Sequence, residues 1–236
     1  YEPFPGICLV DSFELVEELQ LGMFTNENSM RVQEQKEAPI FVVIGNPPYN
    51  AGQVNENDNN KNRKYPAIDK RVAETYAKDS KASNKNALSD PYVKAFRMAS
   101  DRILVRGEGM VCLVTNNAYL DGIAFDGMRS HLGRYFDLIS LIDLGGNVRK
   151  NPKLSGTTHN VFGIQVGVAI CMMEHHADGS DSQLRYARMD EFWTKTEKYR
   201  QLQRWGEAAS VGFTNIQTQR NNVWLTDGMA DDWETL

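Results

Sequence analysis

The sequence has little cysteine, and the positions of its three cysteines argue against disulfides. Cys8, Cys112 and Cys171 lie far apart, each inside an apolar segment, and none belongs to a CxxC pair. Isolated cysteines of this kind are typical of reduced core residues. We therefore expect a cytoplasmic protein without a disulfide framework and without a cysteine-based metal site.

The sequence also lacks long apolar runs and histidine clusters. No run approaches the roughly 18 to 20 apolar residues of a membrane-spanning helix, so no membrane partner is expected. His159, His175 and His176 show no ligand spacing with acidic residues, and no metal site is predicted. The chain starts at Tyr1 without a start methionine or a signal-peptide pattern, which leads us to expect an excerpt of a longer polypeptide.

A surplus of positive charge is missing as well. The chain holds 26 Lys and Arg against 31 Asp and Glu, a formal net charge of −5. Non-specific affinity for nucleic acid comes mainly from Lys and Arg at the phosphates. The balance argues against a stand-alone DNA-binding domain; any basic surface is either local or in a part of the protein not present here.

One stretch organises the rest of the sequence. Ile40 to Ile44 are five consecutive apolar residues, which predict a strand buried on both faces in a parallel sheet. Gly45-Asn46-Pro47-Pro48-Tyr49 follows directly, at the carboxyl end of that strand, where ligands of such sheets bind. Gly45 permits an abrupt turn, and the two prolines stiffen it and remove two backbone donors.

This corner offers hydrogen-bond acceptors to a ligand. The Asn46 side-chain oxygen and the Asn46 and Pro47 carbonyls could hold the two N–H donors of a planar amine, and the Tyr49 ring could stack on the ring that carries the amine. Acceptors that hold both N–H groups would leave the nitrogen lone pair available for nucleophilic attack. The alternative is an ordinary Pro-Pro turn after a buried strand, with Tyr49 as a packing residue.

A second strand with an acid at its end is expected near the start of the chain. Gly6 to Val10 is a short apolar run that leads into Asp11-Ser12-Phe13. Asp11 could accept hydrogen bonds from a nucleotide. The alternative, which the residues alone favour, is that Asp11 caps a helical segment from Phe13 to Leu21.

Residues 50 to 90 differ in composition from their surroundings. They are rich in asparagine, show little apolar periodicity, and carry a basic group beside the corner: Lys61, Arg63, Lys64, Lys70 and Arg71. One interpretation is a mobile, solvated insertion. The other is a basic loop that contacts the nucleic-acid backbone around an extruded base.

The remainder of the chain alternates strands and helices. Asp90-Pro91 predicts a helix start, and Gly107 with Gly109 its end. Strands are expected at 110–115 and 138–144, with a helix around 125–135 between them, followed by β-rich segments at 160–170 and 184–189 and a helix at 190–204. Gly145-Gly146 reads as a polar loop because no helix follows it. This alternation predicts a doubly wound α/β sheet.

The tetrapeptide Asn46-Pro47-Pro48-Tyr49 after a hydrophobic strand resembles motif IV of amino-methyltransferases that use S-adenosylmethionine, chiefly the γ-type N6-adenine DNA methyltransferases. Four further stretches are similar to the methyltransferase module of type ISP restriction-modification enzymes. They are residues 1–6, Asp143 to Asn147, Asn160-Val161-Phe162 and Gly167 to Ile170. The resemblance covers residues 1 to about 173.

The resemblance implies a Rossmann-like methyltransferase fold with a mostly parallel sheet and a double-stranded DNA substrate with a flipped adenine. By this resemblance, Asn46, Pro47, Pro48 and Tyr49 would bind the target amine. Asp11 and Phe13 would contact the adenine of S-adenosylmethionine, and Phe162 would contact the target base. The alternative for Phe162 is a buried strand aromatic. Nuclease, helicase and target-recognition regions would belong to the same longer polypeptide.

The sequence departs from the family in one respect. The glycine-rich motif I should lie upstream of Asp11 and is absent, so the sheet is expected to lack its first strands. Residues 1–205 are then the C-terminal part of a methyltransferase catalytic domain, and 206–236 a linker towards a target-recognition domain. The alternative functions are methylation of RNA or of a protein glutamine, and a non-catalytic DNA-binding remnant.

Overall fold

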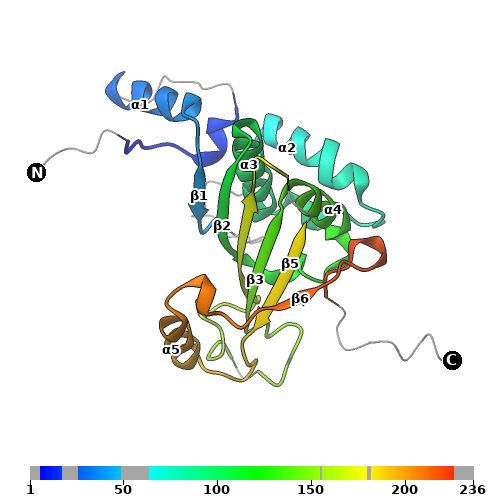
Figure 1. Cartoon of the computed structure of the whole chain (residues 1–236). Helices are drawn as coiled ribbons and strands as arrows, with labels where there is room; N and C mark the ends of the chain where they lie inside the picture. Colours follow the sequence, from blue (N-terminus) through cyan, green and yellow to red (C-terminus); the bar gives the residue numbers. More distant parts are fainter. Residues whose placement is uncertain (1–5, 18–25, 49–63, 155, 180–181, 226–236) are drawn as a thin grey trace, which may run out of the picture.

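The computed structural model describes residues 6–17, 26–48, 64–154, 156–179 and 182–225. They form a mixed α/β domain around one open sheet (Figure 1). The strands are β1 (Val42–Gly45), β2 (Gly109–Asn116), β3 (Leu138–Gly145), β4 (Val168–His175), β5 (Gln183–Arg188) and β6 (Thr214–Ile216). The helices are α1 (Asn26–Glu37), α2 (Pro66–Val72), α3 (Pro91–Arg106), α4 (Asp126–Tyr135) and α5 (Lys195–Trp205).

The strand order in the described sheet is β1-β2-β4-β3-β5-β6. β1 pairs with β2, and β3 with β5, in parallel; β4 is antiparallel to both β2 and β3, and β6 is antiparallel to β5. β1, β2, β3 and β5 therefore run in one direction, as the expected mostly parallel α/β sheet requires. Their carboxyl ends meet at one edge, where ligands of such sheets bind.

Helices cover the sheet on two sides. The main core lies between one face of β2, β3 and β4 and the helices α3 and α4, with Phe96, Ile103, Met128 and Leu132 fully buried. A smaller core on the opposite face joins β3, β4 and β5 to the segment that contains α5. None of the described helices is long and apolar enough to cross a membrane.

The predicted limits of α3 are confirmed. The Asp90 side chain accepts a hydrogen bond from the Tyr92 N–H, Pro91 occupies the first turn, and Gly107 ends the helix in the left-handed region with φ 88°. An Asp cap, a proline that needs no helical donor and a glycine that tolerates positive φ each suit their position. The expected strands and helix between residues 110 and 144 also form.

The strand expected over residues 6–10 does not form. Ile7 and Leu9 are 65% and 73% exposed. The Leu9 backbone instead exchanges two hydrogen bonds with the Asn28 side chain of α1, at 2.8 and 2.9 Å. An apolar run becomes a strand only when another strand supplies its hydrogen bonds, and no described strand lies beside this one.

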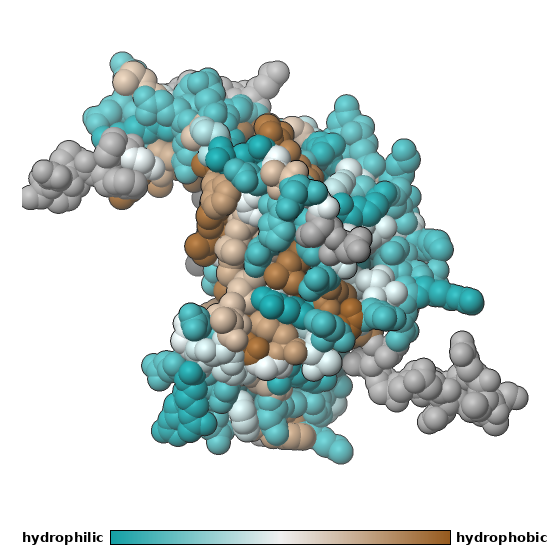
Figure 2. Space-filling view, viewed as in Figure 1, coloured by the Kyte–Doolittle hydropathy of each residue, from teal (hydrophilic) through white to brown (hydrophobic). Residues whose placement is uncertain are grey.

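β1 forms as predicted but is not buried on both faces. Val42 and Ile44 are 44% and 76% exposed, whereas Val43 packs against the main core. β1 is an edge strand among the described residues, with β2 as its partner on one side. The space-filling view shows apolar side chains over the region of β1 (Figure 2).

The described part of the 50–90 segment is not a solvated insertion. Residues 64–90 include α2 and a π-helical turn over Ala73–Ala77, and Ile68 and Tyr76 are fully buried. Apolar residues at 65, 68, 72 and 76 form the buried stripe, and the surrounding Lys and Asn residues obscured it in the sequence. Residues 50–63 lie outside the described part of the chain.

The C-terminal expectations also need correction. Residues 160–167 form turns, and strand β4 begins only at Val168. The segment expected as an edge strand, β5, lies between β3 and β6. α5 starts at Lys195 because Thr194 and Glu197 form a capping box, whereas Asp190 closes only a local turn with the Phe192 N–H. The predicted end at Trp205-Gly206 is confirmed.

Packing continues beyond residue 205, where a linker was expected to begin. β6 pairs with β5, and Trp224 is 4% exposed and packs edge-on against Tyr119 at 6.4 Å between ring centroids. The Arg129 guanidinium of α4 donates to the Asn222 carbonyl at 2.6 Å. Residues 206–225 therefore pack as part of the domain.

We expect Trp224→Ala to lower the free energy of unfolding by about 3 to 5 kcal/mol, because it empties a buried aromatic site in the core. Val105→Ala, at a position 91% exposed on α3, is the control and should change stability by less than about 0.5 kcal/mol. Urea unfolding followed by circular dichroism measures both. Equal effects of the two variants would contradict the placement of Trp224 in the core.

Candidate active site

The Asn46-Pro47-Pro48 corner lies at the carboxyl end of β1, as predicted. Asn46 is exposed, and among the described residues its side-chain amide has no hydrogen-bond partner. The three residues border two cavities, one of about 710 Å³ and one of about 660 Å³. Both volumes fall in the range of small-molecule sites, roughly 300 to 1,000 Å³. Tyr49 lies outside the described residues.

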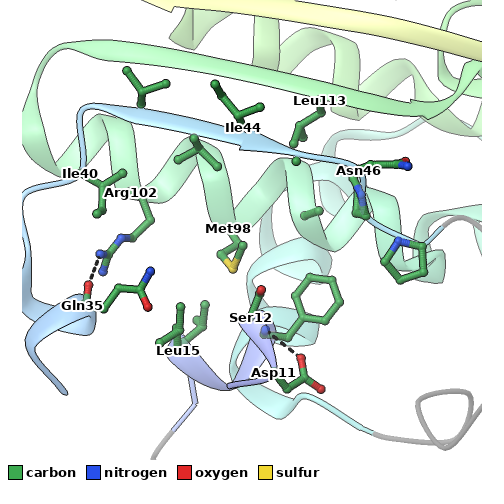
Figure 3. A pocket seen from close by; sticks show the side chains of 18 residues that line it. Asp11, Ser12, Leu15, Gln35, Ile40, Ile44, Asn46, Met98, Arg102 and Leu113 are labelled. Atoms are coloured by element: carbon green, nitrogen blue, oxygen red, sulfur yellow. Dashed lines mark hydrogen bonds between the residues drawn. The ribbon is translucent and has the colours of Figure 1, made fainter. Parts of the chain in front are cut away.

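The first cavity lies between β1 and the segment that carries Asp11 and Phe13, so the structure brings these predicted residues to the corner. Figure 3 shows Asp11 and Ser12 on the wall opposite β1, Met98 of α3 at the back, and Asn46 at the end of the strand with its amide directed away from Asp11. Apolar walls with a few polar groups suit a nucleoside.

Asp11 caps a helix, as the alternative interpretation predicted, and it also lines the first cavity. Its carboxylate accepts the Phe13 N–H at 3.1 Å, which caps the short helix Ser12–Leu15, and the Tyr65 hydroxyl at 2.5 Å. The Phe13 ring meets the Tyr65 ring edge-on at 5.1 Å and is 7% exposed. The two contacts to Tyr65 fix the orientation of both predicted cofactor residues.

Arg102 closes the other end of the first cavity, and sequence analysis did not identify it. Its guanidinium donates to the Gln35 and Ala38 carbonyls at 2.6 and 3.2 Å, which ties α3 to the end of α1. Burial lowers the pKa of Arg102. No motif marks this residue, because its partners are backbone carbonyls more than 60 positions away.

The second cavity lies on the other side of the corner. Its walls include Asn46, Arg149, Thr157, Phe162 and Gln165. Phe162 is 43% exposed, so the ring is not the buried strand aromatic of the alternative interpretation. The structure therefore places Phe162 and Asn46 at a common cavity.

Two buried polar side chains hold the Phe162 turn. Asn160, 1% exposed, donates to the Gly146 and Val166 carbonyls at 3.1 and 2.6 Å and accepts the Phe162 and Ile164 N–H groups at 2.9 and 3.3 Å. All hydrogen-bonding capacity of this amide is used, within the turn and in one bond to Gly146 after β3.

Lys198 of α5 supports the same turn from outside the sheet. It is fully buried, and its ammonium donates to the Leu144 and His159 carbonyls, each at 2.6 Å. Burial lowers the pKa of Lys198. The Tyr199 hydroxyl adds a bond to the Val161 carbonyl at 2.8 Å. The position of Phe162 thus depends on packing between α5 and the end of β3.

Of the basic residues predicted to contact DNA, the three that the structure describes do not line either cavity at the corner. Lys61 and Arg63 lie outside the described residues, and Lys64 is exposed. Lys70 and Arg71 belong to α2, where Lys70 pairs with Glu74 at 3.8 Å and Arg71 forms a bidentate pair with Asp101 of α3. Neither lines a cavity with Asn46.

Polar residues also gather where β2, β3 and β5 end. Asp143, 5% exposed, accepts bonds from the Asn117 amide, the Gly145 N–H and the Tyr186 hydroxyl, at 2.9 to 3.1 Å. Burial, and secondarily Asp143, raises the pKa of Tyr186. These internal bonds make the group a structural cluster. In the described part of the chain, no three His, Cys, Asp or Glu residues are arranged to hold a metal ion.

Three long proteins of known structure are similar to this chain over nearly its whole length. They are DrdV in a complex with DNA (35% identity over 99% of this chain, TM-score 0.85), the ATP-dependent type ISP restriction-modification enzyme LlaBIII bound to DNA (33% over 95%, 0.84), and a nuclease-deletion mutant of the type ISP enzyme LlaGI with a DNA substrate mimic (33% over 95%, 0.85).

The chain spans 23%, 15% and 18% of the length of these three proteins, respectively. No curated protein shows a significant match to it. Residues 15–149, more than half of the chain, match the Eco57I restriction-modification methylase family, and this match includes the corner after β1. The chain belongs to the Eco57I restriction-modification methylase family and is similar to the methyltransferase module of type ISP enzymes.

Proposed function

We propose that this chain transfers a methyl group from S-adenosylmethionine to the N6 amino group of an adenine in DNA, as part of a larger restriction-modification enzyme. One observation carries the proposal: the Asn46-Pro47-Pro48 corner borders two cavities, with Asp11 and Phe13 on one and Phe162 on the other. A methyl donor and an acceptor base can then meet at the corner from opposite sides.

The residues of the first cavity fit the nucleoside part of the cofactor. The Asp11 carboxylate is an acceptor for an amine or a hydroxyl, and the walls around Leu15 and Met98 are apolar. When bound, S-adenosylmethionine supplies an electrophilic methyl group on a sulfonium. Asp11, already oriented by Tyr65, would hold the adenosine end without rearranging.

The corner would act on the amine of the target base. The Asn46 side-chain oxygen and the Pro47 carbonyl would accept its two N–H groups, and the nitrogen lone pair would attack the methyl carbon. The N–C bond forms as the S–C bond breaks, and the proton leaves from nitrogen to solvent, with no covalent enzyme intermediate. Catalysis then rests on alignment and on acceptors for the charge that develops on nitrogen.

The rest of the cofactor site would come from another part of the longer polypeptide. The exposed Val42 and Ile44 on β1, with no strand beyond them among the described residues, support this proposal. The alternative interpretation is a non-catalytic remnant, which would not bind the cofactor. Calorimetric titration of S-adenosylmethionine distinguishes the two, because a remnant gives no binding even within the complete protein.

Asn46→Ala in the complete enzyme is expected to lower kcat for DNA methylation by at least about 100-fold, because one acceptor for the reacting amine is lost. The Kd for S-adenosylmethionine should change by less than about twofold, since the amide is directed away from Asp11. Asn151→Ala, which removes an amide that lines neither cavity, is the matched control. Methylation rates and calorimetry provide the two readouts, and near-normal turnover would remove Asn46 from this role.

The substrate class can be tested with tritium-labelled cofactor. Offered duplex DNA, RNA and a release-factor-like protein, the complete enzyme should label DNA, and enzymatic digestion should recover the label as N6-methyladenine. The DNA-bound relatives support this expectation. Label in RNA or in a protein glutamine would instead support the alternative substrates, because the same corner could hold their amino groups.

A further inference from the structure

The loop that carries Phe162 is a flap with two branches, residues 146–150 and 157–166. The branches approach closely because Gly146, at φ 77°, lacks a Cβ that would stand 2.8 Å from the His159 carbonyl oxygen and 2.9 Å from the Asn160 Cα. The Val148 N–H donates to the Gln165 carbonyl at 3.1 Å. Together with the bonds of Asn160, these contacts make the flap one preformed unit.

Arg149 lies on the first branch and lines the second cavity together with Phe162 of the other branch. Its side chain is exposed, and the described part of the chain provides no carboxylate or hydrogen-bond partner for its guanidinium. The next residue contrasts with it, because the ammonium of Lys150 is paired with Asp121. The remaining polar groups of the cavity wall, those of Asn46, Thr157 and Gln165, are uncharged.

We propose that Arg149 binds a phosphate that flanks the base held between Asn46 and Phe162. A base rotated out of a duplex stays attached to its sugar and phosphates, so a cavity that receives the base must also accommodate an anion at its mouth. A guanidinium is the side chain best suited to a phosphate, with donors in a fixed fork. The flap then holds one nucleotide by two parts: Phe162 contacts the base and Arg149 the phosphate.

This inference rests on the proposed function and deepens it. It adds a contact from the flap to the backbone contacts predicted for residues 61 to 71. Lys70 and Arg71 are paired with Glu74 and with Asp101 of α3, whereas Arg149 lines a cavity together with the Asn46 corner. Asn160 fixes the distance between the two contacts, since it bonds to Gly146 on one branch and to Phe162 on the other.

The experiment compares 2′-deoxyadenosine with 2′-deoxyadenosine 5′-monophosphate, titrated separately into the 236-residue chain and followed by NMR chemical shifts. We expect the wild type to bind the nucleotide about fivefold more tightly than the nucleoside, as one exposed ion pair allows. Arg149→Gln should abolish this preference and leave nucleoside affinity unchanged. Lys153→Gln, which removes an exposed charge from the same loop outside the cavity, is the control and should retain the preference.

The outcomes separate the two proposals. Equal affinity of the wild type for both ligands, or a preference that survives in Arg149→Gln, would overturn the role of Arg149 and leave the adenine site standing. A preference lost equally in Lys153→Gln would show a diffuse charge effect and would overturn it too. Binding of neither ligand to the wild type would contradict the adenine site itself, and the inference with it.

Discussion

The parallel pairing of β1 with β2 is the constraint on which the site depends. Its register is set at the start of β2, where the Met110 N–H donates to the Phe41 carbonyl at 2.8 Å. Gly109 makes this approach possible, because a Cβ there would lie 2.3 Å from the Phe41 oxygen. A slip by one residue would exchange the two faces of β1, withdraw Val43 from the core and turn the Asn46 corner to the other side.

Local signals in the sequence predicted the elements that depend on local chemistry. The limits of α3 follow from Asp90, Pro91 and Gly107. Asp90 caps the helix with its side chain, and the other two act through their own backbone conformation. β2 and β3 follow from short apolar runs bounded by turn residues. The corner could be predicted because two prolines after a strand leave few alternatives. These features can be predicted without knowing which other segments of the chain pack against them.

The wrong predictions concern segments whose state is decided by distant partners. Residues 6–10 have a strand-like composition, but no described strand pairs with them. The segment 64–90 is rich in polar side chains, but its Ile68 and Tyr76 are buried against α3 and α4. Residues 206–225 show little periodicity, but Trp224 fills a gap beside Tyr119. Lys198 was missed for the same reason, because its ammonium bonds to the Leu144 and His159 carbonyls, 54 and 39 positions away.

The distribution of positive charge bears on how the proposed reaction on DNA could proceed in a chain with a net charge of −5. Several arginines are used inside the fold: Arg97 lies between the Tyr76 and Tyr135 rings, and Arg129 donates to backbone carbonyls. Arginines that are held by rings and carbonyls inside the fold are not available to contact phosphates. Under the proposed function, general attraction to DNA would come from regions outside this chain. In that reaction this domain would position the substrate. The hydrogen bonds of Asn160 and Val148 already hold the flap in one conformation, so little ordering entropy would be lost on binding.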